Sequence, residues 1–189
     1  ILIVYVLVFN LKYFFMLRLL FIGQFVLLSQ LSFAQSFVGL PNGNEKIESS
    51  NPSFEEEVLL LVNKERKKRG RKPLVWKQKL AFAARYHAKD MAVDNYFDHP
   101  TKDAKKRGRL RKICDVFERM DQFVKGAFFS RAENIAVGEK TPKQVMKDWM
   151  SSKGHRRNIL DKDARFIGVG FIQMKNSEWG TYWVQSFGM

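Results

Sequence analysis

Cysteine is nearly absent from this chain of 189 residues, which contains only Cys114. A single cysteine cannot form a disulfide within the chain, so packing rather than cross-linking must stabilise the fold. We expect Cys114 to be a free structural or surface thiol rather than a nucleophile. No cysteine follows the apolar run near the N-terminus, which argues against a bacterial lipoprotein anchor.

Two catalytic signatures are also missing. The sequence has no HExxH pattern, which excludes the usual zinc-protease arrangement, and no GxSxG nucleophile elbow. A serine nucleophile, Ser151 or Ser152 acting with His155, is a remaining alternative, although the sequence offers no evident buried aspartate partner. Internal repeats and low-complexity tracts are absent as well.

Acidic residues are scarce relative to basic ones, with 19 Asp and Glu against 33 Lys and Arg and a net charge of +14. Residues 62–72 and residues 102–112 each contain seven basic residues and one acid. Neither run contains an aromatic residue, whereas nucleic-acid-binding surfaces tend to interleave the two kinds. We expect lipid or an anionic cell-surface polymer as partner rather than nucleic acid, or simply a solvated basic face. No obligate protein partner is evident, and we expect a monomer.

The N-terminal residues 1–34 have the pattern of a secretory signal peptide. They contain two basic residues and no acid, a short apolar run at 19–28, and Ala34 as a small residue for cleavage. The first methionine is Met16, so we expect translation to start there and residues 1–15 to be an extension of the gene model. The predicted location is secreted or periplasmic. A retained membrane anchor is the alternative, although the apolar run is shorter than the ~20 residues of a spanning helix.

Residues 35–52 are polar and contain Gly, Pro, Asn and Ser, which predicts a linker ahead of one domain at 53–189. Ser53 and Glu56 have the spacing of a capping box and predict the start of a first helix. Gly70 is the expected end of that helix.

The next part of the chain predicts two further helices. The second runs from about Lys77 to Asn95, and His87 lies on its apolar face as a core histidine rather than a ligand. The third begins at Thr141. The intervening residues 101–130 give no clear pattern, and a broken helix is one interpretation.

The C-terminal part predicts strands. Residues 166–174 form a continuous apolar run that suits a buried strand, and residues 181–187 are β-branched and aromatic and pair back as a hairpin. Another short strand is predicted at 135–138. Helices first and strands last predict an α+β fold in which helices pack on a small antiparallel sheet.

Three polar residues stand out as site candidates. Pro100 restricts His99 to extended backbone, so His99 leaves the second helix and can point into a cleft. Glu133 lies in the apolar segment AENIA, and His155 follows the third helix in GHRRNIL. Two imidazoles and a carboxylate are the ligand set of an open zinc site. Without metal, the same set is an acid/base pair oriented by a carboxylate or a hydrogen-bonded brace without turnover.

Taken in order, these motifs resemble the CAP superfamily, the cysteine-rich secretory, antigen 5 and pathogenesis-related proteins, and most closely its secreted bacterial SCP-like branch. The resemblance runs from Phe54 to Phe187 and rests on LVNKERKKRGRKPLVW, LAFAARYHAKDMAVDNYFDH, AENIAVG, DWMSSKGHRRNIL, FIGVGF and YWVQSFG. It implies a three-layer α-β-α sandwich with a central antiparallel sheet. It also implies a cleft that holds His99, Glu133 and His155.

The function that this resemblance implies is a secreted binding or effector module. Some members are associated with lipid or sterol binding and others with a divalent metal such as zinc at the histidines. The alternative is a metal-dependent or acid/base hydrolase that uses His99, Glu133 and His155. Many members carry a second acid three residues after the tryptophan of the third helix. Here Trp149 is followed at that spacing by Ser152, so a hydroxyl lines the cleft instead.

Overall fold

The computed structural model describes residues 37–104 and 109–189, and residues 37–189 form one compact unit. The predicted signal peptide at 1–34 lies outside the described residues. Within the described ranges, no helix is both long enough and apolar enough to cross a membrane.

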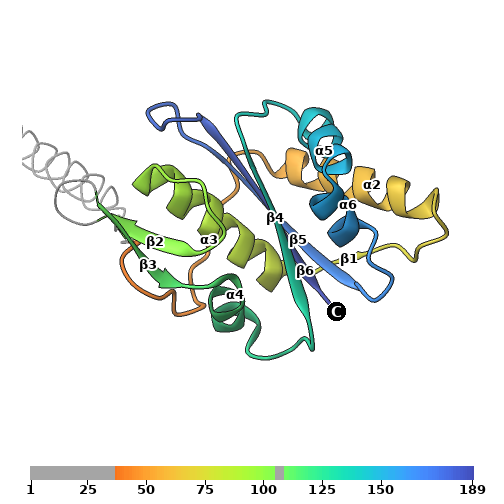
Figure 1. Cartoon of the computed structure of the whole chain (residues 1–189), viewed down its shortest axis with the longest axis horizontal. Helices are drawn as coiled ribbons and strands as arrows, with labels where there is room; N and C mark the ends of the chain where they lie inside the picture. The colour runs from red at the N-terminus through yellow and green to blue at the C-terminus, as the bar shows by residue number, and fades with distance from the viewer. Residues whose placement is uncertain (1–36, 105–108) are drawn as a thin grey trace, which may run out of the picture. The chain divides into compact units, whose positions relative to one another are not determined.

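A four-stranded sheet lies between two layers of helices (Figure 1). The strands, in their order across the sheet, are β1 (Val75–Trp76), β5 (Phe166–Gln173), β6 (Thr181–Gly188) and β4 (Arg131–Val137). One face is covered by α3 (Gln78–Asp94) and α4 (Val116–Val124). The other face is covered by α2 (Pro52–Lys67), α5 (Pro142–Ser151) and α6 (Lys153–Ile159). This arrangement confirms the predicted α+β three-layer sandwich.

The three long strands of the sheet are antiparallel, as predicted. β5 and β6 form the expected hairpin, with Gln173 opposite Thr181. β6 also pairs with β4, in which Glu133 lies opposite Ser186. The short strand predicted at 135–138 is part of β4, which starts at Arg131 and therefore includes Glu133. β1 adds a two-residue parallel pairing at the edge of β5.

Glycines in β5 allow α3 to pack directly on the sheet. The side chains of Ile167 and Val169 point into the core on the α2 and α5 side, so the intervening Gly168 faces α3. A Cβ at Gly168 would lie 2.0 Å from the backbone nitrogen of Ala81, a separation that no side chain can occupy. The two backbones are therefore in contact, which fixes α3 and its buried His87 against the sheet.

The predicted linker packs against the domain. Phe37 and Ile47 are 8% and 9% exposed and join the core between α3, α4 and the sheet. The backbone nitrogen of Ser50 donates to the carbonyl of Phe171 at 3.0 Å. Apolar side chains spaced singly through a polar segment give no periodic signal, so the sequence did not reveal this packing.

The first helix begins one residue before its predicted start, and the predicted capping box does not form. Asn51 is the N-cap residue and Pro52 occupies the first turn. The hydroxyl of Ser53 donates to the side chain of Asn51 at 2.8 Å and does not cap a helix amide. Proline suits the first helical position because that position needs no N–H donor.

Residues 101–130 contain a hairpin and a helix rather than one broken helix. β2 (Thr101–Ala104) pairs antiparallel with β3 (Leu110–Cys114), and α4 follows. The carboxylate of Asp115 accepts from the backbone nitrogens of α4, and the Glu118 carboxylate accepts from the Asp115 nitrogen at 2.8 Å, which forms a capping box. Only the inner end of the hairpin is buried, at Thr101 and Cys114, so no alternating pattern marks its strands. Cys114 is buried and forms no disulfide.

The third predicted helix is confirmed, but a further short helix follows it. Thr141 caps α5 through its side chain, which accepts from the backbone nitrogen of Gln144 at 3.3 Å. Ser152 has extended backbone, with φ −79° and ψ 126°, and is both the C-cap of α5 and the N-cap of α6. His155 therefore lies in α6 and not in a loop after the third helix.

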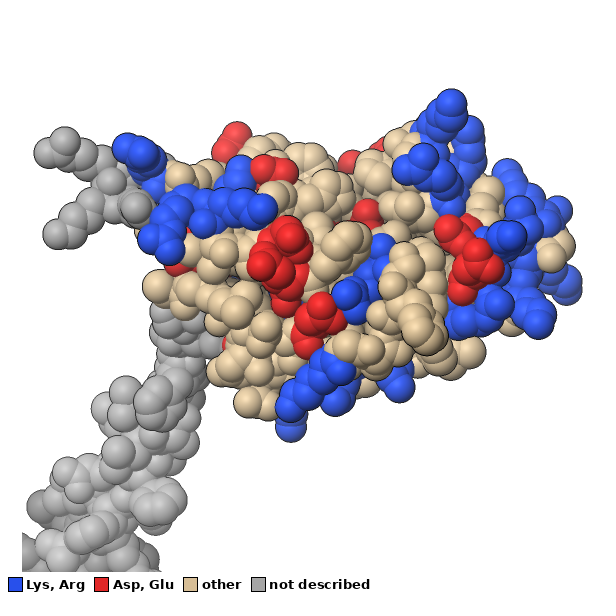
Figure 2. Space-filling model, turned by 60° about the horizontal axis from the view of Figure 1, so that its bottom comes forward, with Lys and Arg blue, Asp and Glu red and all other residues tan. Residues whose placement is uncertain are grey.

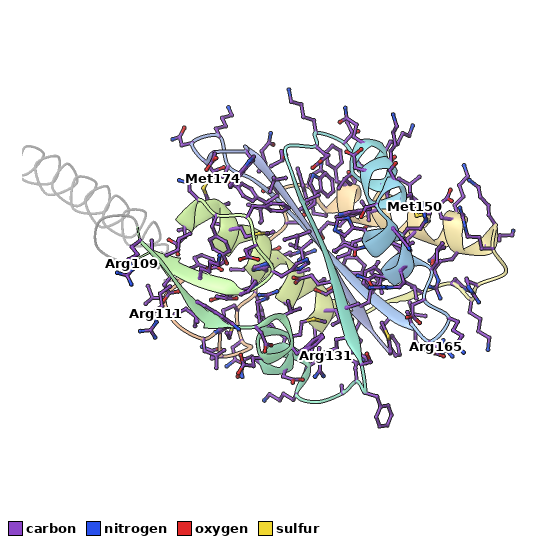
Figure 3. All side chains as sticks on the ribbon, in the orientation of Figure 1. Arg109, Arg111, Arg131, Met150, Arg165 and Met174 are labelled. Atoms are coloured by element: carbon purple, nitrogen blue, oxygen red, sulfur yellow. The ribbon has the colours of Figure 1, made fainter. Side chains whose placement is uncertain are left out.

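The two basic runs lie at opposite ends of the domain. Figure 2 shows Lys and Arg gathered at the right of the view, where α2 ends in Figure 1, and again at the left over the hairpin. In the hairpin run, Arg109 and Arg111 project outward (Figure 3). Residues 105–108 of that run lie outside the described residues.

Candidate functional site

Glu133 lies at the centre of a network of buried charges. Its side chain is 2% exposed, Oε2 accepts from Arg119 Nη2 at 2.6 Å, and Oε1 lies 3.0 Å from Nδ1 of His99. Burial alone would raise the pKa of Glu133, but the Arg119 guanidinium, together with His87 and His99, lowers this pKa to about 2. Glu133 is therefore ionised at neutral pH, and both of its oxygens are engaged.

His99 is the exposed member of the network, with 44% of its side chain accessible to solvent. Because Glu133 is ionised and can only accept, Nδ1 of His99 must carry the proton and donate it. In the neutral ring, Nε2 then has a free lone pair. A carboxylate that holds one ring nitrogen in this way orients the other toward a metal or a ligand. The geometry gives Glu133 a positioning role and leaves Nε2 of His99 as the group that can bind.

Arg119 is a site residue that the sequence analysis missed. Its fully buried guanidinium donates to Glu133, to the backbone oxygen of His99 at 2.9 Å and to Oγ1 of Thr101 at 3.0 Å. One side chain thus connects α4 to β4 and to the turn that carries His99. A signal was present in the sequence, since Arg119 lies beside the apolar Met120 on a helix whose existence was not recognised.

His87 is a core histidine, as predicted. It is fully buried, and Nε2 donates to the backbone oxygen of Asp98 at 2.9 Å. Burial, and then the charge of Arg119, lower its pKa to about 3, so the ring is neutral. Two carboxylates lie near the ring, since Oε1 of Glu133 is 3.9 Å from Nε2 and Oδ2 of Asp90 is 4.0 Å from Nδ1. Asp90 lies one turn further along the same helix, whereas the tertiary fold brings Glu133 from β4.

Two asparagines fasten α6 to β4 next to Glu133. Nδ2 of Asn134 donates to the backbone oxygen of His155 at 3.1 Å, and Nδ2 of Asn158 donates to the backbone oxygen of Glu133 at 3.2 Å. Burial lowers the pKa of His155, and the nearby charge of His99 lowers it further. The structure therefore brings His155 into the electrostatic range of His99. Neither asparagine was singled out from the sequence, although both flank predicted site residues.

A cavity of about 370 Å³ opens beside His99 and Glu133. Its wall is part apolar and part polar and consists of His99, Asp115, Val116, Phe117, Arg131, Ala132, Glu133 and Asn158. His155 and Ser152 are not among these lining residues. Ser152 is instead a partly buried helix cap, and the hydroxyl of Ser151 donates to the Lys147 carbonyl at 2.8 Å.

The donor groups at the site limit how a metal ion could bind. The described part of the chain has no group of three or more His, Cys, Asp and Glu placed to hold a metal. Glu133 is a poor ligand, because its carboxylate is buried and already paired with Arg119 and His99. Of the predicted ligand set, this leaves the imidazoles of His99 and His155, and a tetrahedral ion would need water at its remaining positions.

Comparison with known proteins identifies the family. The model of the cysteine-rich secretory protein family, CAP, matches residues 59–187. The Bacillus subtilis (strain 168) protein YkwD is 40% identical over 140 residues, which cover 74% of this chain and 48% of YkwD. The membrane protein YlbC of the same organism is 33% identical over 129 residues, which cover 67% of this chain and 34% of YlbC. The chain thus spans about half and about a third of these relatives.

A solved structure gives the same result. An extracellular protein with an SCP domain from Bacillus anthracis str. Ames superposes with a TM-score of 0.59 and 26% identity, over 72% of this chain and 40% of that one. The family model covers residues 59–187, which include most of the described domain. The chain belongs to the CAP family of cysteine-rich secretory proteins.

Proposed function

We propose that this CAP domain is an extracellular binding module whose ligand enters the cavity beside His99, and not a hydrolase. The observation that carries the proposal is the pairing of the buried Glu133 carboxylate with Arg119 and His99. A general base must reach the proton that it removes from a substrate, whereas Glu133 is held by the Arg119 guanidinium and by the Nδ1 proton of His99. With a pKa of about 2, Glu133 is also a very weak base at neutral pH.

The cavity wall indicates the kind of ligand. Val116, Phe117 and Ala132 offer carbon surface, while His99 and Asn158 offer polar groups at one side. Ligand sites of this size are typically apolar with a few polar groups that fix orientation. We therefore propose a small ligand whose apolar part contacts the wall and whose polar group, or an accompanying divalent cation, reaches Nε2 of His99.

A divalent metal such as zinc is the simplest probe of this imidazole. When bound, the metal would supply a Lewis-acidic centre. In this proposal, His99 and His155 hold the ion, and Glu133 keeps Nδ1 of His99 protonated. An extracellular location is supported by the Bacillus anthracis relative, which is described as extracellular, and by the signal-peptide pattern at 1–34.

Thermal unfolding with and without zinc tests the proposal. At about 100 times Kd, a ligand of the folded state stabilises it by ~2.7 kcal/mol, which for a domain of this size raises Tm by roughly 5–10 °C. His99→Ala and His155→Ala should each abolish the shift. The chain has three histidines, and the third, His87, is buried, so it cannot replace the imidazole that either variant loses. Glu133→Gln should weaken zinc binding about 10–100-fold without abolishing it.

The outcomes separate the alternatives. No shift at millimolar zinc would remove the metal from the proposal, and a shift that survives in both histidine variants would place the metal elsewhere. Turnover of peptide, ester or glycan substrates that disappears in Glu133→Gln would overturn the binding module in favour of a hydrolase.

A further inference from the structure

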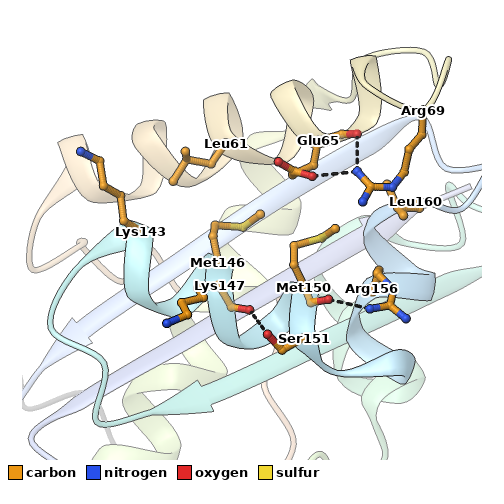
Figure 4. Close-up of a pocket in the computed structure, with 10 residues that line it drawn as sticks. All are labelled: Leu61, Glu65, Arg69, Lys143, Met146, Lys147, Met150, Ser151, Arg156 and Leu160. Carbon is orange, nitrogen blue, oxygen red and sulfur yellow. Dashed lines mark hydrogen bonds and ion pairs between the residues drawn. The ribbon is translucent and has the colours of Figure 1, made fainter.

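A second hollow, the helix groove, lies between α2, α5 and α6 and has a volume of about 500 Å³. Its lining includes Leu61, Arg69, Lys143, Lys147, Met150 and Arg156 (Figure 4). None of the residues that line it also lines the cavity beside His99. The helix groove is therefore separate from the site described above, and its function is independent of the proposed one.

The basic run at 62–72 forms one end of this groove, and a buried arginine holds it in place. Arg66 is fully buried and donates to the backbone oxygen of Lys72 at 2.7 Å and to that of Ile159 at 2.8 Å. These bonds tie the segment after α2 to the end of α6. The other cations of the run are exposed to solvent, and they are Lys64, Lys67, Lys68, Arg69, Arg71 and Lys72.

The one acid that lines the groove offsets only part of its positive charge. Glu65 pairs with Lys68 at 2.6 Å and with Arg69 at 2.7 Å, while Lys143, Lys147 and Arg156 also line the groove. Across the groove, Lys143 and Lys147 are exposed and one turn apart on α5. Figure 4 shows Lys143 toward one end of the groove, with the Arg69 guanidinium toward the other. Cations therefore border the groove along its length.

The floor of the groove is apolar and contains no aromatic side chain. Leu61 points from α2 toward α5, and Met146 and Met150 point from α5 toward α2 (Figure 4). This floor suits the carbon atoms of a narrow chain. Proteins that bind single-stranded nucleic acid stack its bases on aromatic side chains. The groove-lining residues include no aromatic side chain on which a base could stack.

The length of the groove favours a repeating anion over a single one. On the α2 side, the helix alone extends roughly 9 Å from Leu61 to its end at Lys67, at 1.5 Å per residue, which is longer than one phosphate group. We propose that the helix groove binds a linear polymer of phosphodiester-linked polyols. The phosphates contact the cations along both rims, and the polyol carbons lie over Leu61, Met146 and Met150.

Two variants with equal loss of charge test this site. The groove variant carries Arg69→Gln, Lys143→Gln and Lys147→Gln. The control variant carries Arg109→Gln, Arg111→Gln and Lys112→Gln in the hairpin at the other end of the domain (Figure 3). All six side chains are exposed, and glutamine has nearly the helix propensity of lysine and arginine. Both variants should therefore unfold at the wild-type temperature.

The probe is deacylated poly(glycerol phosphate), with binding measured by calorimetry at several salt concentrations. With phosphate contacts to the four cations that line the groove, wild-type affinity should fall roughly 50-fold between 50 and 200 mM salt, at a slope of about −0.7 per contact. The groove variant should bind roughly 100-fold more weakly at 0.1 M salt and lose only about 3-fold over the same range. The control variant and His99→Ala should match the wild type.

Several results would overturn the assignment. Equal losses in the groove and control variants would mean that net charge alone drives binding. An affinity independent of salt would exclude the phosphate contacts. Tighter binding to phosphatidylglycerol vesicles, or to single-stranded DNA of equal charge, than to the polymer would show that a lipid surface or nucleic acid is the partner of the groove.

Discussion

The ion pair between Glu133 and Arg119 offers the sharpest test of how the site is held together. Both side chains are at most 2% exposed. Arg119→Met keeps an unbranched apolar stem in place of the arginine methylenes but leaves the Glu133 carboxylate buried without its strongest partner. Removing one member of a buried pair typically costs about 3–5 kcal/mol, because the remaining charge stays desolvated. We expect a loss of that size in the free energy of unfolding for Arg119→Met and a similar loss for Glu133→Gln.

The double variant should be much less unstable than the sum of the two single ones. With both charges removed, no uncompensated ion is left in the core, so the coupling between Arg119 and Glu133 should be about 3 kcal/mol. Urea unfolding followed by tryptophan fluorescence gives the free energy of unfolding of the wild type, the two single variants and the double variant, which together form a double-mutant cycle. Strictly additive losses, within ~0.5 kcal/mol, would contradict the network described above.

The same pair predicts how stability depends on pH. The pKa of Glu133 is about 2 in the folded state, against 4.5 for a free glutamate. A depressed acid contributes stability above its unfolded pKa and loses it as pH falls through the folded pKa. The contribution here is about 3 kcal/mol at 1.36 kcal/mol per pKa unit, and it should vanish between about pH 4.5 and pH 2.

Arg119→Met should remove most of this dependence on pH. Burial would then raise the pKa of Glu133 without the opposing charge of the guanidinium. The measurement is the difference in unfolding free energy between wild type and variant at pH 5 and at pH 2. If both proteins lose the same amount over that interval, Arg119 does not set the pKa of Glu133.

Two further predictions concern the scaffold. Gly168→Ala should destabilise the domain by about 3 kcal/mol or more, because the added Cβ would lie 2.0 Å from the backbone nitrogen of Ala81 in α3. Gly154→Ala in α6 is the control, because its added Cβ meets nothing within 4 Å, and it should stabilise the domain by about 0.5–1 kcal/mol. Thermal melts that rank the two variants in the other order would contradict the direct contact of α3 with β5. Asp115→Ala should remove the capping box of α4 and lower the free energy of unfolding by about 1 kcal/mol. Amide hydrogen exchange should become faster in α4 and stay unchanged in α5. Equal protection of α4 in the wild type and the variant would refute the cap.

The elements with strong local signals were predicted well. The second helix, the third helix with its Thr141 cap, and the hairpin of β5 and β6 each follow from the periodicity of a short stretch and its boundary residues. The hairpin of β2 and β3 was not predicted, because it is largely exposed and only its inner end is buried. His155 was predicted only to follow the third helix, and the further helix that contains it was missed because a single extended residue, Ser152, separates α5 from α6.

The candidate site was predicted in part. His99 and Glu133 do meet, and His155 comes within the electrostatic range of His99. The roles of these residues did not follow from their types, however. A carboxylate such as that of Glu133 can be a metal ligand or a general base, and only its hydrogen-bond partners distinguish the two. Arg119 supplies that information, and it lies in the segment whose fold the sequence left open.

The sequence predicted the helices and strands with strong local patterns, because hydrophobic periodicity and helix caps act over a few residues, while the family resemblance implied the sandwich and the meeting of His99 with Glu133. The partners of Glu133 depend on the tertiary structure. Its two oxygens are paired with residues 14 and 34 positions away along the chain, in α4 and in the turn after α3. Burial makes an unpaired charge costly, and this long-range pairing places Glu133 where it can orient His99.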